Sequence, residues 1–238
     1  MSGQITDIYE LKKLAVDYDV NDIRERYLKL YSPLIHDAME FLGLSGRAMD
    51  SGIYPLTVDM KAAGPAFTIR RISTPERSPE VHNIRLGLIK SMSEGCIMLS
   101  DSQNNRNCGQ FGEITATAMR AAGCQGAVID GSTRDSNHLI RMNFPTFCRF
   151  RSPLEGLGRS MITEYMIPIY VNGADGQLLV YPGDFVFGDN DGVVIVPKDM
   201  TLKVLEQAEE WFYSEGNSRK AMADGMDPFE AYNKFGRF

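Results

Sequence analysis

Apolar and polar positions along the chain switch repeatedly between a strand period and a helical period. Residues 31–43, "YSPLIHDAMEFLG", place apolar side chains three and four apart, with Ser32 as the expected N-cap and Gly43 as the stop. Short apolar runs predict strands at 62–71, 95–101, 126–131, 144–150 and 167–173, and a β-hairpin within 176–197 that turns at "DNDG". Amphipathic segments predict helices at 31–43, 81–92, 112–122 and 136–143, one from 199 towards Gly216, a shorter one at 217–224 and a last one around 227–236.

This alternation of strands and helices predicts an α/β fold class. The chain has 238 residues, which is ample to bury a hydrophobic core. No long linker, internal repeat or low-complexity tract divides it. We therefore expect residues 1–238 to form a single domain, with 1–29 as an N-terminal extension and 199–238 as a helical C-terminal extension.

The composition is typical of a soluble globular protein, with 43% hydrophobic and 24% charged residues. The formal net charge of −6 argues against a nucleic-acid partner, because such binding relies on cations that neutralise phosphates. No window approaches the roughly 20 apolar residues that cross a membrane, and the first residues lack the apolar core of a signal peptide. The four cysteines are far apart, which favours reduced thiols and a cytoplasmic location over a disulfide framework or a zinc site.

Motifs for several other chemistries do not fit. "GLGRS" (156–160) and "GADG" (173–176) do not lie between a strand and a helix as a dinucleotide-binding loop requires. "DNDG" (189–192) resembles the start of a calcium loop, but the glycine and glutamate that such a loop needs are out of place, and a hairpin turn fits better. The three histidines are scattered along the sequence. None of these features indicates a site.

Segment 112–135, "GEITATAMRAAGCQGAVIDGSTRD", carries the candidate chemistry. Glu113 begins a predicted helix, and Arg134 and Asp135 follow the next predicted strand. Loops at the carboxyl ends of strands in α/β folds meet at one rim, where helix N-termini favour anions. There an arginine can bind a carboxylate and an aspartate can hold Mg²⁺. The alternative is that Glu113 and Asp135 are only N-terminal helix residues favoured by the helix dipole.

Two further expectations concern charged side chains near this rim. Adjacent residues in an extended segment point to opposite faces, so Arg134 and Asp135 are expected to form a poor ion pair and to contact different parts of a ligand. Segment 70–80, "RRISTPERSPE", is expected to be a solvated loop. The alternative is that its arginines bind a second carboxylate of the substrate.

Segment 112–135 resembles the signature of the family that joins RraA, the regulator of ribonuclease E activity, to the class II 4-hydroxy-4-methyl-2-oxoglutarate (HMG/CHA) aldolases. The resemblance extends over residues 30–238 and implies a layered α/β sandwich of the RraA-like type. Some members carry the name demethylmenaquinone methyltransferase, but no donor-binding loop here supports methyl transfer. The other matching stretches, in order, are "HDAMEFLG" (36–43), "AAGPAFT" (62–68), "FPTFCRFRSP" (144–153) and "PGDFVFGDNDGVVIVP" (182–197).

The resemblance also implies roles for individual residues. Asp135 would be the ligand of Mg²⁺ or Mn²⁺, Arg134 would contact the 2-oxo acid end of the substrate, and Glu113 would organise the water around the metal. At the position of Glu113 the aldolases usually carry aspartate. The ribonuclease regulator carries glutamate there, as this chain does. The backbone N–H groups expected to bind the substrate carboxylate are those of Gly112, Glu113, Ile114 and Thr115.

The family further implies a homotrimer or homohexamer with active sites between subunits. A glutamate from the C-terminal helix of a neighbouring subunit is part of such a site. Counting from "VIVP", Glu215 is the best match, and Glu209 and Glu210 lie near it.

The function implied by the resemblance is metal-dependent cleavage of 4-hydroxy-2-oxo acids to pyruvate, a carbon–carbon lyase reaction, with oxaloacetate decarboxylation at the same site. The partner is then a small 2-oxo acid, with no nucleic acid and no membrane. Two alternatives stay open. One is a regulatory binding protein without catalysis, which Glu113 slightly favours. The other is different sugar-acid lyase or decarboxylase chemistry at the same metal site, suggested by the extension at 217–238.

Overall fold

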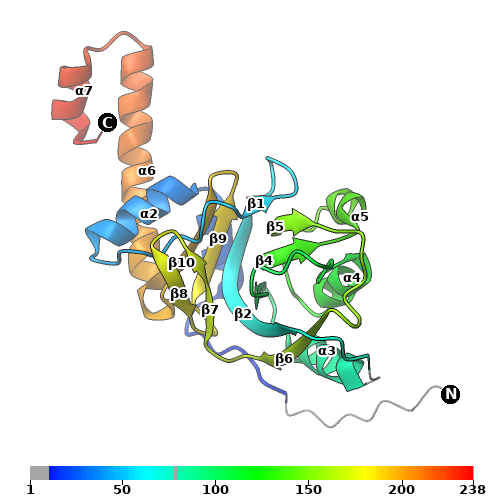
Figure 1. Ribbon diagram of the computed structural model, residues 1–238. Helices are drawn as coiled ribbons and strands as arrows, with labels where there is room; N and C mark the ends of the chain where they lie inside the picture. The colour runs from blue at the N-terminus through cyan, green and yellow to red at the C-terminus, as the bar shows by residue number, and fades with distance from the viewer. Residues whose placement is uncertain (1–10, 78–79, 238) are drawn as a thin grey trace.

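The computed structural model describes residues 11–77 and 80–237, with the backbone alone for 80–82. It is a mixed α/β fold with a nearly closed sheet (Figure 1). The strands are β1 (Tyr54–Pro55), β2 (Ala62–Ser73), β3 (Ile97–Asp101), β4 (Gly126–Thr133), β5 (Thr146–Arg151), β6 (Ser160–Tyr165), β7 (Ile169–Gly173), β8 (Gly176–Val180), β9 (Phe185–Asp189) and β10 (Gly192–Val196). The helices are α1 (Val20–Tyr27), α2 (Ser32–Phe41), α3 (Glu80–Ser91), α4 (Glu113–Ala121), α5 (Ser136–Arg141), the short η1 (Lys198–Met200), α6 (Thr201–Ala223) and α7 (Pro228–Phe235).

The long strand β2 organises the sheet. Its first residues, from Ala62 to Pro65, pair antiparallel with β9, and its following residues pair parallel with β3. Its C-terminal part pairs antiparallel with β6, so that the strand has different neighbours along its length. The strand order is β1-β5-β4-β3-β2-β9-β10, and β7 and β8 form a separate ribbon. Pro65 stands where β2 changes partner, which explains why a residue without an N–H group is tolerated in a central strand.

Helices cover the sheet in two groups. Helix α3 packs beside β6, and α4 and α5 lie beside β4 and β5 (Figure 1). Helices α1, α2 and α6 share a buried cluster with residues of β9 and β10. The first group packs around buried residues such as Phe67, Met98 and Met119. The second group packs around Tyr27 and Phe185, among others. The segments that follow the carboxyl ends of β3 and β4, before α4 and α5, build the candidate site.

Part of the predicted N-terminal extension belongs to the core. Helix α1 lies inside the range 1–29, and its Tyr27 is fully buried against Phe185, with ring centroids 4.3 Å apart. The Tyr27 hydroxyl donates a hydrogen bond to the carbonyl of Thr201 at 2.8 Å, which ties α1 to the start of α6. Residues 1–10 of the expected extension lie outside the described residues.

Helix α2, for which Ser32 was predicted as the N-cap, is instead capped by a residue from another part of the chain. Ser32 is the first residue of α2, and the side chain of the N-cap residue, Tyr31, forms no capping hydrogen bond with the helix. The carboxylate of Asp189 accepts hydrogen bonds from the backbone N–H of Ser32 at 2.8 Å and from its hydroxyl at 2.6 Å. Asp189 ends β9 at the "DNDG" turn, so the predicted β9–β10 hairpin is confirmed and also caps a helix.

The two C-terminal helices predicted at 199–216 and 217–224 are one. Helix α6 continues through Gly216 to Ala223, and α7 packs beside its far end, away from the sheet (Figure 1). A single glycine within a helix costs only about 1 kcal/mol, which α6 tolerates. Over the described part of the chain, no helix is both long and apolar enough to cross a membrane.

Candidate functional site

A cavity of about 240 Å³ opens where β2, α3, the loop before α4, the end of β4 and the segment before β6 meet. It contains the predicted residues Arg134 and Asp135 together with the start of α4. Its described lining residues are Arg71, Arg85, Gly109, Gln110, Phe111, Gly112, Ile114, Thr115, Arg134, Asp135, Glu155, Gly156, Leu157, Ser160, Met161 and Ile162.

Arg134 and Asp135 form an ion pair, contrary to the sequence-based expectation. Arg134 Nε lies 3.5 Å from Asp135 Oδ2. The pair is possible because Asp135 has left-handed backbone angles, φ 57° and ψ 29°, which end the strand alternation before α5. Both side chains are more than a third exposed, at 36% and 40%, so solvent screens the pair and leaves both groups available to a ligand.

Asp135 also faces the start of α4. Its Oδ2 accepts a hydrogen bond from the backbone N–H of Glu113 at 3.2 Å. This approach depends on Gly112, where an added Cβ would lie 2.5 Å from Asp135 Oδ2. At Gly109 an added Cβ would lie 2.5 Å from the Cβ of Arg134. The two glycines therefore let the loop before α4 pack directly against the Arg134–Asp135 pair.

The first turn of α4 offers free hydrogen-bond donors to the cavity. Gly112 is its N-cap and provides no capping side chain. The first N–H groups of a helix have no intrahelical acceptor, and within the described chain those of Ile114 and Thr115 form no hydrogen bond. Both residues line the cavity beside Arg134. Free N–H groups, the helix dipole and a guanidinium together suit a carboxylate.

The side chain of Glu113 is placed along the helix instead of in the cavity. Its Oε1 accepts a hydrogen bond from the Thr117 hydroxyl at 2.9 Å, and Glu113 is not a lining residue. The structure therefore brings the backbone N–H of Glu113 together with Arg134 and Asp135, while the Glu113 side chain lies along α4.

Glu215 lies on α6, outside the cavity of its own chain. Its carboxylate accepts hydrogen bonds from the Tyr31 hydroxyl and from Arg237 Nε, the latter at 3.1 Å. Glu209 on the same helix pairs with Arg26 at 2.6 Å. A role for Glu215 in the site of a neighbouring subunit stays a prediction.

The donor set of the cavity fits a divalent cation held by one or two carboxylates. Asp135 uses only Oδ2 for its contacts with Glu113 and Arg134, which leaves Oδ1 available, and Glu155 is the second lining carboxylate. Mg²⁺ commonly takes one or two protein carboxylates and completes its shell with substrate and water. Among the described residues, the group of three possible ligands that lie together is His36, Asp37 and Glu40 on α2, which is not at the cavity.

Two further arginines line the cavity: Arg85, which the sequence did not single out, and Arg71, which lies in segment 70–80, where binding of a second carboxylate was the alternative to a solvated loop. Arg71 lies in β2 and not in a solvated loop, and it is 7% exposed. Its pKa is lowered to about 10, mainly by burial, which Cys108 opposes and the charge of nearby Arg85 reinforces. Burial also lowers the pKa of Arg85 on α3, and the charge of Arg134 adds to that effect. A bulge between Arg70 and Arg71 marks where the strand departs from regular alternation, and such bulges leave little trace in sequence.

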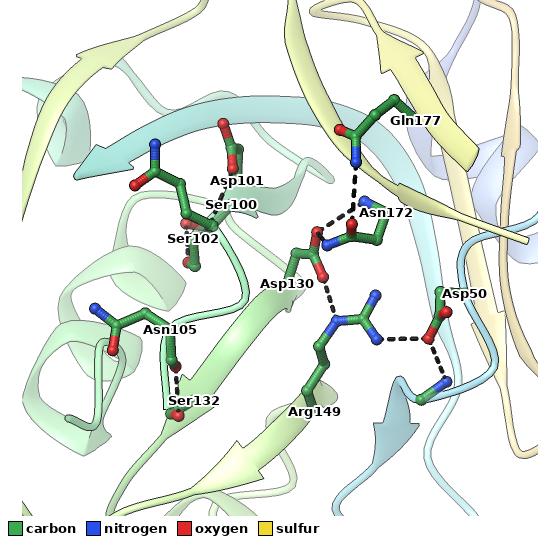
Figure 2. Close-up of polar contacts among 12 residues, drawn as sticks. Asp50, Ser100, Asp101, Ser102, Asn105, Asp130, Ser132, Arg149, Asn172 and Gln177 are labelled. Carbon is green, nitrogen blue, oxygen red and sulfur yellow. Dashed lines mark hydrogen bonds and ion pairs between the residues drawn. The ribbon is translucent and has the colours of Figure 1, made fainter. Parts of the chain in front are cut away.

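Polar contacts hold the strand β4 that carries the site (Figure 2). Buried Asp130 forms an ion pair with Arg149 of β5 and accepts hydrogen bonds from the backbone and side-chain nitrogens of Asn172, both at 2.8 Å. Further along β4, the Ser132 hydroxyl donates to the carbonyl of Asn105 at 2.8 Å. These contacts fix β4, whose end at Thr133 directly precedes Arg134 and Asp135.

The chain is similar to known proteins over most of its length. The model of the RraA-like family, described as aldolase/RraA, matches residues 32–195. A protein of Halalkalibacterium halodurans named "Putative 4-hydroxy-4-methyl-2-oxoglutarate aldolase" is 26% identical over 89% of this chain and 93% of its own. Protein DlpA of Legionella pneumophila is 26% identical over 86% of this chain, which spans only 32% of DlpA.

A solved structure shows the same fold. RraAS2 of Streptomyces coelicolor, a member of the RNase ES inhibitor RraA family, superposes with a TM-score of 0.74 at 22% identity, over 87% of this chain and 99% of its own. The likeness at this identity concerns the fold alone. Because the family model covers most of the chain, including the whole of the cavity segment 109–162, this protein belongs to the RraA-like family.

Proposed function

We propose that this protein is a divalent-metal-dependent lyase that cleaves 4-hydroxy-2-oxo acids to pyruvate and also decarboxylates oxaloacetate. The observation that carries the proposal is the convergence of Arg134, Asp135 and the free N–H groups at the start of α4 on one cavity. The relatives named as aldolases are consistent with it.

Each group has a separate role in binding a 2-oxo acid. The N–H groups of Ile114 and Thr115 and the guanidinium of Arg134 bind the carboxylate end. Asp135 would hold Mg²⁺ or Mn²⁺, which supplies Lewis-acid polarisation of the 2-oxo group when bound. The ion pair with Arg134 and the N–H of Glu113 keep the Asp135 carboxylate oriented towards the ligand.

The bond changes follow from this placement. The 4-hydroxyl loses its proton, the C3–C4 bond breaks, and its electron pair becomes part of the pyruvate enolate, which is then protonated at C3. Arg134 stabilises the negative charge that develops on the enolate oxygen. A water molecule in the cavity takes the hydroxyl proton, because no histidine is found among the described lining residues. In oxaloacetate, loss of CO₂ gives the same enolate.

Coupled pyruvate release tests the proposal. The protein is incubated with oxaloacetate or with 4-hydroxy-4-methyl-2-oxoglutarate, in Mg²⁺ or in EDTA, and pyruvate is measured with lactate dehydrogenase. We expect pyruvate from both substrates in Mg²⁺ and none above background in EDTA. If neither substrate gives metal-dependent pyruvate, the lyase proposal fails and a binding role without catalysis gains support.

Substitutions of Asp135 and Arg134 test the metal-binding role of the first and the charge-stabilising role of the second. Asp135→Asn removes the anionic ligand and should abolish metal-dependent turnover. Arg134→Ala should lower kcat/KM by about 10²-fold or more, as expected for a lost charge-stabilising donor. Arg141→Ala, at the exposed end of α5, is the matched control and should retain activity. Turnover by Asp135→Asn at the normal rate would show that the metal assignment is wrong.

A further inference from the structure

The last residues of β4 extend beyond its neighbour β3. The pairing of the two strands ends at Ser100 and Ile129, whereas β4 continues to Thr133. Backbone N–H and C=O groups that are buried without a hydrogen-bond partner destabilise a fold. The loop before α4 therefore has to supply the partners that β3 no longer offers.

Gln110, in that loop, supplies them with its backbone and its side chain together. Its N–H donates to the carbonyl of Ser132 at 3.0 Å, and its side-chain Oε1 accepts from the N–H of Ser132 at 3.2 Å. Both residues are buried. The side-chain amide thus does for the N–H of Ser132 what the carbonyl of a neighbouring strand does in a regular sheet.

The other end of the same amide reaches a further wall of the cavity. Gln110 Nε2 donates to the hydroxyl of Ser160 at 3.1 Å, and Ser160 is the first residue of β6. Gln110 and Ser160 both line the cavity. Because an amide carries a donor and an acceptor in one rigid group, this side chain fixes the loop before α4 against β4 and β6 at once.

This link lies beside the groups that are assigned to carboxylate binding. Gln110 precedes Gly112, the N-cap of α4, by two residues, and Ser132 precedes Arg134 by two residues. The next contact between the two segments is the N–H of Arg134, which donates to the carbonyl of Phe111 at 2.8 Å. The contacts of Gln110 therefore help to set where the first turn of α4 lies relative to Arg134.

We propose that Gln110 is a positioning residue that holds the free N–H groups at the start of α4 in register with Arg134, so that one carboxylate can bind both. The role rests on the proposed function, because it takes the carboxylate of the substrate to bind at these groups. Both ends of the Gln110 amide are hydrogen-bonded to protein, so Gln110 acts through α4 and β4 and not on the substrate.

Oxalate, an unreactive planar analogue of the pyruvate enolate, tests this role without turnover. The full chain in Mg²⁺ is titrated calorimetrically with oxalate. In Gln110→Met, which keeps the length of the side chain without its amide, the Kd of oxalate should rise about 10-fold or more, and kcat/KM for oxaloacetate should fall by a similar factor. Amide hydrogen exchange of segment 109–116, measured by mass spectrometry, should be about 10-fold faster, because the loop has lost its side-chain link.

Two further variants separate positioning from general stability. Gln110→Glu keeps an acceptor of the same length for the N–H of Ser132, so the exchange of segment 109–116 should stay within about 2-fold of the wild type. Asp189→Ala removes a buried side chain that caps α2 and is not among the described lining residues of the cavity. It should lower stability, while the Kd of oxalate changes by less than about 2-fold.

The outcomes distinguish this role from the lyase reaction. Wild-type oxalate affinity or unchanged hydrogen exchange in Gln110→Met, or an equal loss of affinity in Asp189→Ala, would overturn the positioning role. Oxalate binding that depends on Gln110, in a wild type that releases no pyruvate, would support the role and remove the lyase reaction alone. Pyruvate release by Gln110→Met at the wild-type rate would remove the role of Gln110 alone.

Discussion

One residue conformation decides the geometry of the candidate site. With φ 57°, Asp135 occupies a region that costs most side chains energy but that aspartate tolerates better than others. In an extended conformation its carboxylate would point away from Arg134. In the left-handed conformation it instead reaches both Arg134 Nε and the N–H of Glu113. The unusual backbone therefore couples the end of β4 to the start of α4.

The close approach of α4 makes Gly112 a sensitive position. In Gly112→Ala, the new Cβ would lie 2.5 Å from Asp135 Oδ2 and 3.2 Å from Arg134 Cγ, so both side chains must move. We expect kcat/KM for oxaloacetate to fall by about 10-fold or more, because small displacements of positioning groups are costly. Circular dichroism should show an unchanged fold.

Gly216→Ala is the matched control for that substitution. Gly216 lies within α6, and nothing is found within 4 Å of a Cβ added there. Activity should be retained, and urea unfolding should show a gain of about 0.5–1 kcal/mol from the better helix former. Normal kcat/KM in Gly112→Ala would mean that the Asp135 contact with α4 is dispensable.

Sequence reasoning found the residues whose chemistry follows from spacing and missed those set by tertiary packing. Arg134 and Asp135 are adjacent after an apolar run, so their place at a strand end could be predicted. Arg71 ends the predicted strand 62–71 and also falls in segment 70–80, which was expected to be a solvated loop; the bulge in β2 and the packing of α3 place it at the cavity. The side-chain direction of Glu113, towards Thr117, likewise depends on contacts that the sequence does not specify.

At the scale of elements, a hairpin turn stabilises a helix that is distant in sequence. Asp189 accepts two hydrogen bonds from Ser32 and a third from the backbone N–H of Asp191 at 3.0 Å. The cap is buried, so its loss leaves polar groups of α2 without a partner. This arrangement explains how α2 begins without a capping side chain of its own.

We predict that Asp189→Ala lowers the free energy of unfolding by about 1–3 kcal/mol, the cost of a lost cap and unsatisfied buried groups. Chemical denaturation followed by far-UV circular dichroism measures it. Asp191→Ala is the control: its side chain is exposed and its backbone N–H is retained, so stability should change by less than about 0.5 kcal/mol. Equal effects of the two substitutions would show that Asp189 does not cap α2.

The elements that escaped prediction have weak local signals. Helix α1 places Ile23 and Tyr27 one turn apart, and Asp19 caps it by accepting from the N–H of Asn21 at 2.9 Å. These cues are present in the sequence, but residues 1–29 were expected to be an N-terminal extension and no helix was predicted there. Strand β6 has an irregular pattern of exposure and owes its structure to pairing with β2. Tertiary pairing, which a single sequence does not reveal, determined it.

At the scale of the whole molecule, buried charges join parts of the chain that are far apart in sequence. Arg149 on β5 pairs with Asp130 on β4 and, at 2.5 Å, with Asp50 in the loop before β1, and Asp130 in turn binds Asn172 on β7 (Figure 2). The side chains of Arg149 and Asp130 are 8% and 1% exposed. The network thus connects the sheet below the cavity to the β7–β8 ribbon.

Removing the positive charge of Arg149 from this network should destabilise the protein strongly. Arg149→Met leaves the buried Asp130 carboxylate uncompensated, and we expect a loss of about 3–5 kcal/mol in the free energy of unfolding, measured by urea denaturation. Adding Asp130→Asn to that variant removes the stranded charge while keeping an oxygen for Asn172, so the double variant should be more stable than Arg149→Met. Arg70→Met, which breaks a pair whose side chains are 36% and 50% exposed, should cost less than about 1 kcal/mol. If the double variant is no more stable than Arg149→Met, burial of an unpaired Asp130 charge is not the cause of the loss.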